Sequence, residues 1–471
     1  MATSDSDDGV RIQQLVEQAL ALSTADHCVV IGEERTEANL RWAANSLTTN
    51  GQMHSRKLCV ISILNGAEGP SSGVVSGPVT GADPQTELAA LVTASEAAAR
   101  AASVADDAAP LVEPAEHDDD WDAPAARTGI EVFADFAPAL GRAFAEATAA
   151  GRLLYGFAEH ILTSTYLATS AGVRRRFDQP TGRIELNAKS ADLSASAWVG
   201  RQTRDFSDID VEVLTADLAR RLSWSANKID LPAGRYETLL PPTAMADLMV
   251  YLYWTASSRD AEEGRNVFTA KSGNTRIGQT LSPLALTLRS DPTEAGMQCA
   301  PFEITPTGGM ESVFDNGAPV TATNWITDGT LTNLHRTRNW ASRTGDPHVP
   351  LVDNLILSEA NGTKTLDEMI ASTTRGLLVT CLWYIREVDP QTLLLTGLTR
   401  DGVYLIEDGE VTGVVNNFRF NESPVDLLGR ISEVGATELT LPREWSDFFT
   451  RAAMPPVRVP DFNMSTVSQA S

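Results

Sequence analysis

Residues 105–128 interrupt the chain with a segment that cannot contribute to a hydrophobic core. Prolines and acidic side chains dominate the segment, including an acidic run at 116–120, and apolar anchors are few. Such a composition cannot bury enough apolar surface to offset the entropy lost on ordering, so we predict a flexible acidic linker. The 471-residue chain is therefore expected to fold as separate units on either side of this linker.

Two predicted units precede residue 231, and each combines helices with strands. Residues 1–104 are expected to form a small N-terminal α/β domain and residues 129–230 a middle α+β domain. Apolar residues at i, i+3 and i+4 predict helices, and short β-branched runs predict strands. The predicted helices are 10–23, a helix beginning at Pro84 behind the N-cap Asp83, 130–149 and 210–226; the predicted strands are 28–31, 59–64 and several within 153–206.

The third predicted unit, residues 231–455, is a β-rich C-terminal domain that carries a long helix, which completes an α+β fold. The helix should follow Pro241 and Pro242, with Thr243 as a potential N-cap. Its apolar face comprises Met245, Leu248, Met249, Leu252 and Tyr253. A capping box formed by Thr365 and Glu368 predicts a shorter helix. The other predictions are a strand at 376–385, one at 393–398, a hairpin around 403–406, an exposed hairpin end at 174–182, and a tail at 456–471.

Charge and cysteine use restrict the classes of function. The 62 acidic and 37 basic side chains give a net charge of −25, which argues against binding to nucleic acid or to an anionic membrane. We find no apolar run of the roughly 20 residues needed to span a bilayer and no secretory signal. The four cysteines form no CxxC pair and are expected to be reduced. We therefore expect a cytoplasmic protein.

The search for chemistry yields few candidates, and we assign no catalytic or metal-binding residue. No phosphate loop or nucleophile elbow is present, and no two histidines are spaced three to five residues apart. His117 beside the acidic residues 118–120 offers at most adventitious metal binding. Cys381 lies in an apolar run, which favours an inert buried thiol over a nucleophile. The arginines at 174–176 could clamp a carboxylate, although a solvated hairpin tip is the simpler reading, and Glu262 and Glu263 are expected to form a hydrated surface.

Four consecutive C-terminal patterns carry a family resemblance. Residues 388–392 (VDPQT), 395–402 (LTGLTRDG) and 404–410 (YLIEDGE) resemble a characteristic strand pair of the TldD/PmbA (TldE) metallopeptidase-related family. Residues 414–421 (VVNNFRFN) resemble a further strand of its PmbA branch. The predicted order of domains is similar to that family as well.

The resemblance implies a specific role for the long helix. In the catalytic branch of the family this helix carries H-E-x-x-x-H, whose histidines bind zinc, with a cysteine near the C-terminus as third ligand. The corresponding residues 246–255 contain neither histidine nor glutamate, and no cysteine follows Cys381. The chain therefore resembles the PmbA/TldE-like branch that lacks the zinc motif. We expect no cofactor in this chain and zinc in a partner subunit.

The resemblance implies a heterodimer or larger complex with a TldD-like H-E-x-x-x-H subunit, acting on peptides or unfolded segments. One alternative is a homomeric peptide-binding or scaffold protein, including a homodimer, that binds extended peptides by strand addition. Another is an independent, diverged hydrolase that would have to use groups such as His335, Arg338, Asp346 or Cys381. The candidates to line a substrate cleft are Asn333, His335, Arg336 and Arg338 in a polar segment, and Tyr253 and Trp254 on the long helix. The alternative interpretations are that the polar segment is a surface loop and that the two aromatic residues belong to the core.

Overall fold

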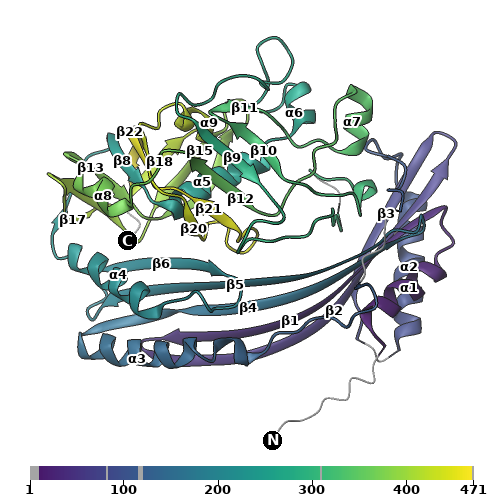
Figure 1. Cartoon of the computed structure of the whole chain (residues 1–471), viewed down its shortest axis with the longest axis horizontal. Coiled ribbons are helices and arrows are strands. Elements are labelled where there is room, and N and C mark those ends of the chain that lie inside the picture. Colours follow the sequence, from purple (N-terminus) through teal and green to yellow (C-terminus); the bar gives the residue numbers. More distant parts are fainter. Residues whose placement is uncertain (1–9, 81–82, 115–119, 308–309, 469–471) are drawn as a thin grey trace, which may run out of the picture.

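The computed structural model describes residues 10–80, 83–114, 120–307 and 310–468. A long curved sheet forms one layer, and the C-terminal half of the chain packs as a second body over one of its faces (Figure 1). Within the described residues, every helix is too short or too polar to cross a membrane. The arrangement mixes helices and sheets throughout, which confirms the α+β class.

The large sheet is antiparallel and has six strands in the order β3-β2-β1-β4-β5-β6. Its strands are β1 (His27–Ala43), β2 (Ser46–Gly66), β3 (Gly69–Pro78), β4 (Arg152–Thr169), β5 (Arg174–Ser190) and β6 (Ser196–Thr203). The helices of this part are α1 (Ile12–Leu22), α2 (Pro84–Ala101), η1 (Ile130–Phe133), α3 (Phe136–Ala149) and α4 (Val211–Trp224). As predicted, Asp83 caps α2 by accepting from the Thr86 backbone N–H.

The two faces of the large sheet bury different partners because side chains alternate along each strand. In β1, Val30 packs with α1 and α2, whereas its neighbours Val29 and Ile31 pack with Phe302 and Phe314 of the C-terminal half. Helices α3 and α4 cover a further cluster toward the other end of the sheet. The second face therefore joins the sheet to the C-terminal body.

The C-terminal half contains two sheets with a helix buried between them. One has the strand order β11-β10-β9-β12-β21-β20, and the other has the order β14-β15-β18-β22-β8-β13-β16-β17-β7, with β19 paired to β22. The strands are β7 (Lys228–Ile229), β8 (Gly234–Leu240), β9 (Leu286–Ser290), β10 (Thr323–Thr327), β11 (Thr330–Leu331), β12 (Leu355–Glu359), β13 (Arg375–Val379), β14 (Leu382–Asp389), β15 (Leu394–Thr399), β16 (Val403–Glu407), β17 (Glu410–Val415), β18 (Phe418–Glu422), β19 (Glu433–Val434), β20 (Glu438–Thr440), β21 (Ala452–Met454) and β22 (Val457–Val467). The helices are α5 (Pro242–Trp254), α6 (Ser258–Glu262), η2 (Val313–Asp315), α7 (Arg338–Thr344), α8 (Leu366–Ala371) and α9 (Pro424–Leu428).

Helix α5 is the long predicted helix, and it is buried on nearly all sides. Ten of its 13 residues are buried, and the cluster around them includes residues of both sheets, such as Leu288 and Phe420. Pro241 rather than Thr243 is the N-cap, because the Thr243 hydroxyl donates instead to the carbonyl of Thr380. The helix therefore forms the centre of the C-terminal body.

The structure corrects several predicted boundaries. The predicted tail at 456–471 contains β22, an inner strand whose neighbours are β18 and β8. The predicted units 1–104 and 129–230 share one sheet through the pairing of β1 with β4. The described parts of the predicted linker 105–128 make specific contacts: Asp106 pairs with Arg259, and Tyr166 donates to the Ala123 carbonyl.

Two local predictions also change. Residues 180–182 lie inside β5, paired with β4, rather than at an exposed hairpin end, and Arg176 is buried against Tyr166 and Asp178. The predicted strand 376–385 is two strands, β13 and β14, separated at Thr380 and Cys381. The desolvation cost of burying Arg176 is offset because its guanidinium has both a carboxylate and a hydroxyl partner.

Candidate functional site

A cavity of about 400 Å³ lies between the large sheet and the C-terminal body. The sheet contributes residues of β1, β4 and β5, and α5 contributes its last two residues, Tyr253 and Trp254. The rest of the wall comes from Val320 and from four loop segments around residues 300–304, 310–311, 351–353 and 448–449. The cavity is thus assembled from parts of the chain that are far apart in sequence.

Aromatic and acidic side chains line this cavity together. The aromatic residues are Phe177, Tyr253, Trp254, Phe302, Phe448 and Phe449, and the carboxylates are Glu33, Glu303, Glu311 and Asp353. Phe448 is 78% exposed, which is unusual for a phenylalanine unless it forms part of a contact surface. A wall of this kind suits a ligand that has both apolar and cationic groups.

Burial changes the protonation of two of these carboxylates. Desolvation raises the pKa of Glu303 to about 8, against the opposing effect of the Arg338 charge. Desolvation, together with the neighbouring carboxylates of Glu303 and Asp353, raises the pKa of Glu311 to about 7. Asp353 is ion-paired with Arg451. Perturbed carboxylates in a cavity are typical of binding or catalytic sites.

The two α5 aromatics, both candidates from the sequence, line the cavity and differ in their exposure. Tyr253 is only 2% exposed. Its hydroxyl donates to the Val352 carbonyl at 2.9 Å and accepts from the Val352 N–H at 2.7 Å, so it fixes the cavity loop at 351–353. Trp254 is half-buried and packs edge-on against Trp445 at 5.2 Å between ring centroids. Trp254 is the more accessible of the two.

The four polar candidates at 333–338 do not line this cavity. His335 is fully buried, and its backbone pairs with Ser257. Arg336 is buried between Glu262 (3.6 Å) and Asp346 (3.3 Å).

The other two polar candidates are also held by internal hydrogen bonds. Asn333 donates through its side chain to the Asn324 carbonyl at 2.8 Å, and the Arg338 guanidinium donates to the Phe314 carbonyl at 3.1 Å. The sequence reasoning missed the carboxylates of Glu33, Glu303 and Glu311. No spacing signal could reveal them, because they come from separate segments.

The other candidate groups from the sequence that the structure describes are buried or are held by contacts within the protein. Cys381 is fully buried, and burial raises the pKa of its thiol to about 12, so the reactive thiolate is disfavoured even though the Arg443 guanidinium contacts it. Arg174 pairs with Glu17 at 2.6 Å. Glu262 accepts a hydrogen bond from the Trp340 indole. His117 and residues 118–119 lie outside the described residues.

A second cavity, of about 760 Å³, lies elsewhere on the chain. Its lining includes Lys189, Arg400, Asp401 and Arg443 but no residue of α5. Arg443 is already paired with Asp401 at 2.8 Å, and its guanidinium lies over the Trp383 ring. The smaller cavity, beside the central helix, is therefore the better candidate for the functional site.

Comparison with known proteins identifies the family to which this architecture belongs. Residues 233–466 match the family model described as the PmbA/TldA metallopeptidase C-terminal domain. The chain belongs to the TldD/PmbA family. This assignment confirms the resemblance found in the sequence.

Solved structures share the fold over nearly the whole chain. TldE from Thermococcus kodakarensis is 15% identical and has a TM-score of 0.76, with 96% of this chain and 99% of that chain covered. A Thermotoga maritima protein named as a candidate modulator of DNA gyrase is 16% identical, with a TM-score of 0.73 and the same coverages. A similarly named protein from Bacteroides thetaiotaomicron is 13% identical, with a TM-score of 0.75 and coverages of 99% and 100%.

The central helix of this TldD/PmbA-type domain does not fit a zinc ion. Helix α5 contains no histidine, cysteine or glutamate, and Asp247 is its one carboxylate. Asp247 is fully buried, and one of its oxygens accepts the Glu444 backbone N–H at 3.0 Å. Burial raises the pKa of Asp247 well above its usual range, which disfavours the carboxylate form that a metal needs. A single buried acid cannot supply the three ligands of a catalytic zinc site.

Proposed function

We propose that this chain is the substrate-holding subunit of a TldD/TldE-type zinc peptidase that acts on peptides or unfolded segments. The observation that carries the proposal is the position of α5. The helix contributes Tyr253 and Trp254 to the cavity wall, yet it offers no set of side chains that could hold zinc. A partner chain with H-E-x-x-x-H would supply the metal and the general base. The shared fold with a protein named TldE supports this role.

The lining of the cavity supports a peptide as ligand. Aromatic rings bury apolar side chains, and an acidic side chain such as Glu33 attracts lysine, arginine or an N-terminal amine. The large sheet forms one wall through Thr163 and Thr165 of β4. We infer that an unfolded segment with basic and apolar residues binds between this sheet and the C-terminal body.

Two alternative functions make different demands on the structure. A homomeric peptide-binding or scaffold protein would bind the same ligand in this cavity, but no partner would convert binding into cleavage. An independently active hydrolase would have to use groups other than His335 and Cys381, because both are buried. The peptidase subunit is therefore the proposal favoured by the cavity and the central helix together.

Peptide binding by the isolated chain tests the proposed substrate site. We expect a fluorescently labelled, unstructured peptide that contains arginine and leucine to bind, as measured by fluorescence anisotropy. The substitution Phe448→Ala removes the exposed aromatic side chain of the cavity. Loss of one aromatic contact of about 1 kcal/mol weakens Kd roughly fivefold.

A matched variant controls for nonspecific effects on the surface. Met53 on β2 is 60% exposed and does not line the cavity, so Met53→Ala should bind the peptide like the wild type. If the wild type does not bind the peptide, or if the two variants bind equally well, the cavity is not the substrate site.

A further inference from the structure

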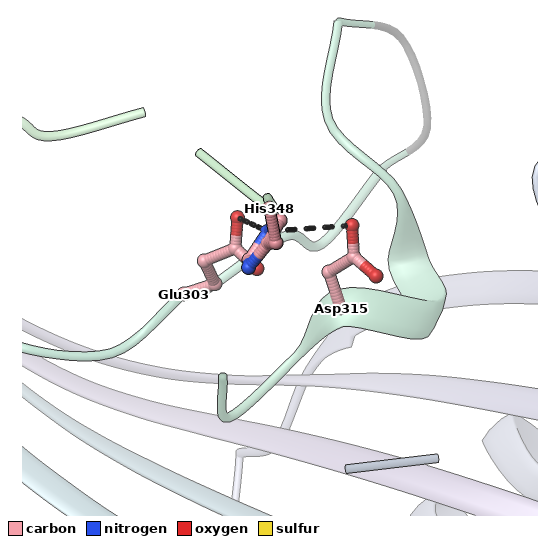
Figure 2. Close-up of side chains that lie close together, drawn as sticks. All are labelled: Glu303, Asp315 and His348. Carbon is pink, nitrogen blue, oxygen red and sulfur yellow. Dashed lines mark ion pairs between the residues drawn. The ribbon is translucent and has the colours of Figure 1, made fainter. Parts of the chain in front are cut away.

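Three residues from separate segments meet beside the cavity: Glu303, Asp315 and His348 (Figure 2). Glu303 follows Phe302 in an extended loop, Asp315 ends η2, and His348 lies in the loop after α7. One ligand atom from each residue lies within 4.8 Å of the other two. His348 Nε2 is 3.5 Å from Glu303 Oε1 and 4.0 Å from Asp315 Oδ2.

Each of the three side chains has a buried polar atom without a hydrogen-bond partner. These atoms are Glu303 Oε2, Asp315 Oδ1 and His348 Nε2. The side chains of Glu303 and Asp315 are only 5% and 1% exposed. Buried polar atoms are nearly always paired, so three unpaired atoms in one cluster indicate a missing ligand.

The donor atoms of the cluster identify the kind of ligand. Arg338 provides one positive charge, with its guanidinium Nη1 3.9 Å from Asp315 Oδ1, and its backbone N–H donates to the other Asp315 oxygen at 3.1 Å. Arg338 is thus the basic side chain that contacts this cluster of two acidic side chains. The Nε2 atom of His348 faces both carboxyl groups. The cluster therefore presents carboxyl oxygens and an imidazole nitrogen, the donor atoms that transition-metal ions bind in proteins.

We propose that Glu303, Asp315 and His348 form a binding site for a divalent transition-metal ion of the Zn²⁺ or Mn²⁺ type. Imidazole favours zinc and other transition metals, and carboxylates suit both zinc and manganese. Metal–ligand bonds of about 2.1 Å place tetrahedral donors about 3.4 Å apart, so the donor atoms have to move together only slightly. The ion would favour the ionised form of both carboxyl groups and would pair the three polar atoms.

This site is distinct from the zinc motif of the family, because none of its ligands lies on α5. Its position points to a local role. Glu303 also lines the cavity, and Phe302 and Phe314, next to the proposed ligands, pack on Val29 and Ile31 of the large sheet. A bound ion would tie the loops that form the cavity wall to one another. The inference does not rest on the proposed peptidase role.

Metal titration of the full-length chain tests the site. Protein treated with a chelator is titrated with Zn²⁺ and separately with Mn²⁺ by isothermal calorimetry, and Co²⁺ is added to record its visible absorption as a probe of ligand geometry. The test variants are Glu303→Gln, Asp315→Asn and His348→Gln. The matched control is His54→Gln: His54 also contacts a glutamate, Glu34, at 3.0 Å, but Glu34 already pairs with Arg56 and Arg127.

We expect the wild type and His54→Gln to bind one equivalent of Zn²⁺ or Mn²⁺ and to show a higher Tm with metal. Each test variant should bind at least tenfold more weakly. If a carboxylate variant fails to fold, His348→Gln decides the question, because that side chain is 20% exposed and its loss is better tolerated. The proposal is wrong if the wild type binds no metal, or if the variants bind as the wild type does, which would place an adventitious ion elsewhere.

Discussion

At the scale of single residues, His335 illustrates how burial controls charge. The side chain is fully buried, and desolvation lowers its pKa to about 4 against a weak opposing effect of Asp260. In the unfolded chain a histidine has a pKa near 6.5. Between about pH 6.5 and pH 4 the unfolded state therefore binds a proton that the folded state does not. The stability that His335 provides is complete above about pH 6.5 and is lost as the pH falls toward 4.

The pH dependence of unfolding tests this account of His335. Lowering the pH from 7.5 to 5 should cost the wild type about 2 kcal/mol more in free energy of unfolding than the His335→Gln variant, because the variant lacks the titrating group. Urea unfolding at both pH values gives the difference. The variant His27→Gln, which removes an exposed histidine, serves as control for the loss of an imidazole. Equal pH dependence in the wild type and in His335→Gln would contradict the buried, neutral state.

Predictions about single residues succeeded where the neighbours in the sequence determine whether a side chain is buried. Cys381 could be predicted to be buried because its neighbours are apolar. The polar candidates at 333–338 could not be placed, since residues such as Glu262, far away in sequence, pair with them in the fold. The acidic lining of the cavity was missed for the same reason: Glu33 and Glu311 meet only after folding.

At the scale of elements, the predicted capping box of α8 is confirmed. The Glu368 N–H donates to the Thr365 hydroxyl at 3.2 Å, and the Thr365 N–H donates to the Glu368 carboxylate at 2.8 Å. The substitution Thr365→Ala should destabilise the protein by about 1 kcal/mol, because it leaves an N-terminal N–H of the helix without its partner. A lower urea midpoint for Thr365→Ala than for the neighbouring exposed-site variant Thr363→Ala would show this. Identical midpoints would mean that the cap does not contribute.

Strand lengths were underestimated because buried polar residues mask the apolar alternation. The predicted strand 28–31 is only the start of β1, which continues to Ala43. Beyond Ile31 the strand carries Glu34, which is buried because Arg56 and Arg127 neutralise it. A pattern based on hydrophobicity alone cannot recognise such a strand.

At the scale of the whole molecule, long-range strand pairing determined features of the fold that could not be predicted from the sequence. Val29 of β1 pairs with Thr169 of β4, 140 residues later, and this pairing merges two predicted units into one sheet. The family and the α+β class could be predicted, because the C-terminal strand patterns are local and long. The cavity between the sheet and the C-terminal body could not, because it exists only where the two pack.

The central claim is that this chain holds substrate while a partner provides hydrolysis, and reconstitution tests it most directly. The chain is mixed with a TldD-type protein that carries H-E-x-x-x-H, and cleavage of an unfolded fluorogenic peptide is followed as the ratio of the two proteins is varied. The account predicts no cleavage by this chain alone and activity that rises with the partner and is abolished by a chelator. Cleavage of the peptide by this chain alone, at the rate of the mixture, would contradict it.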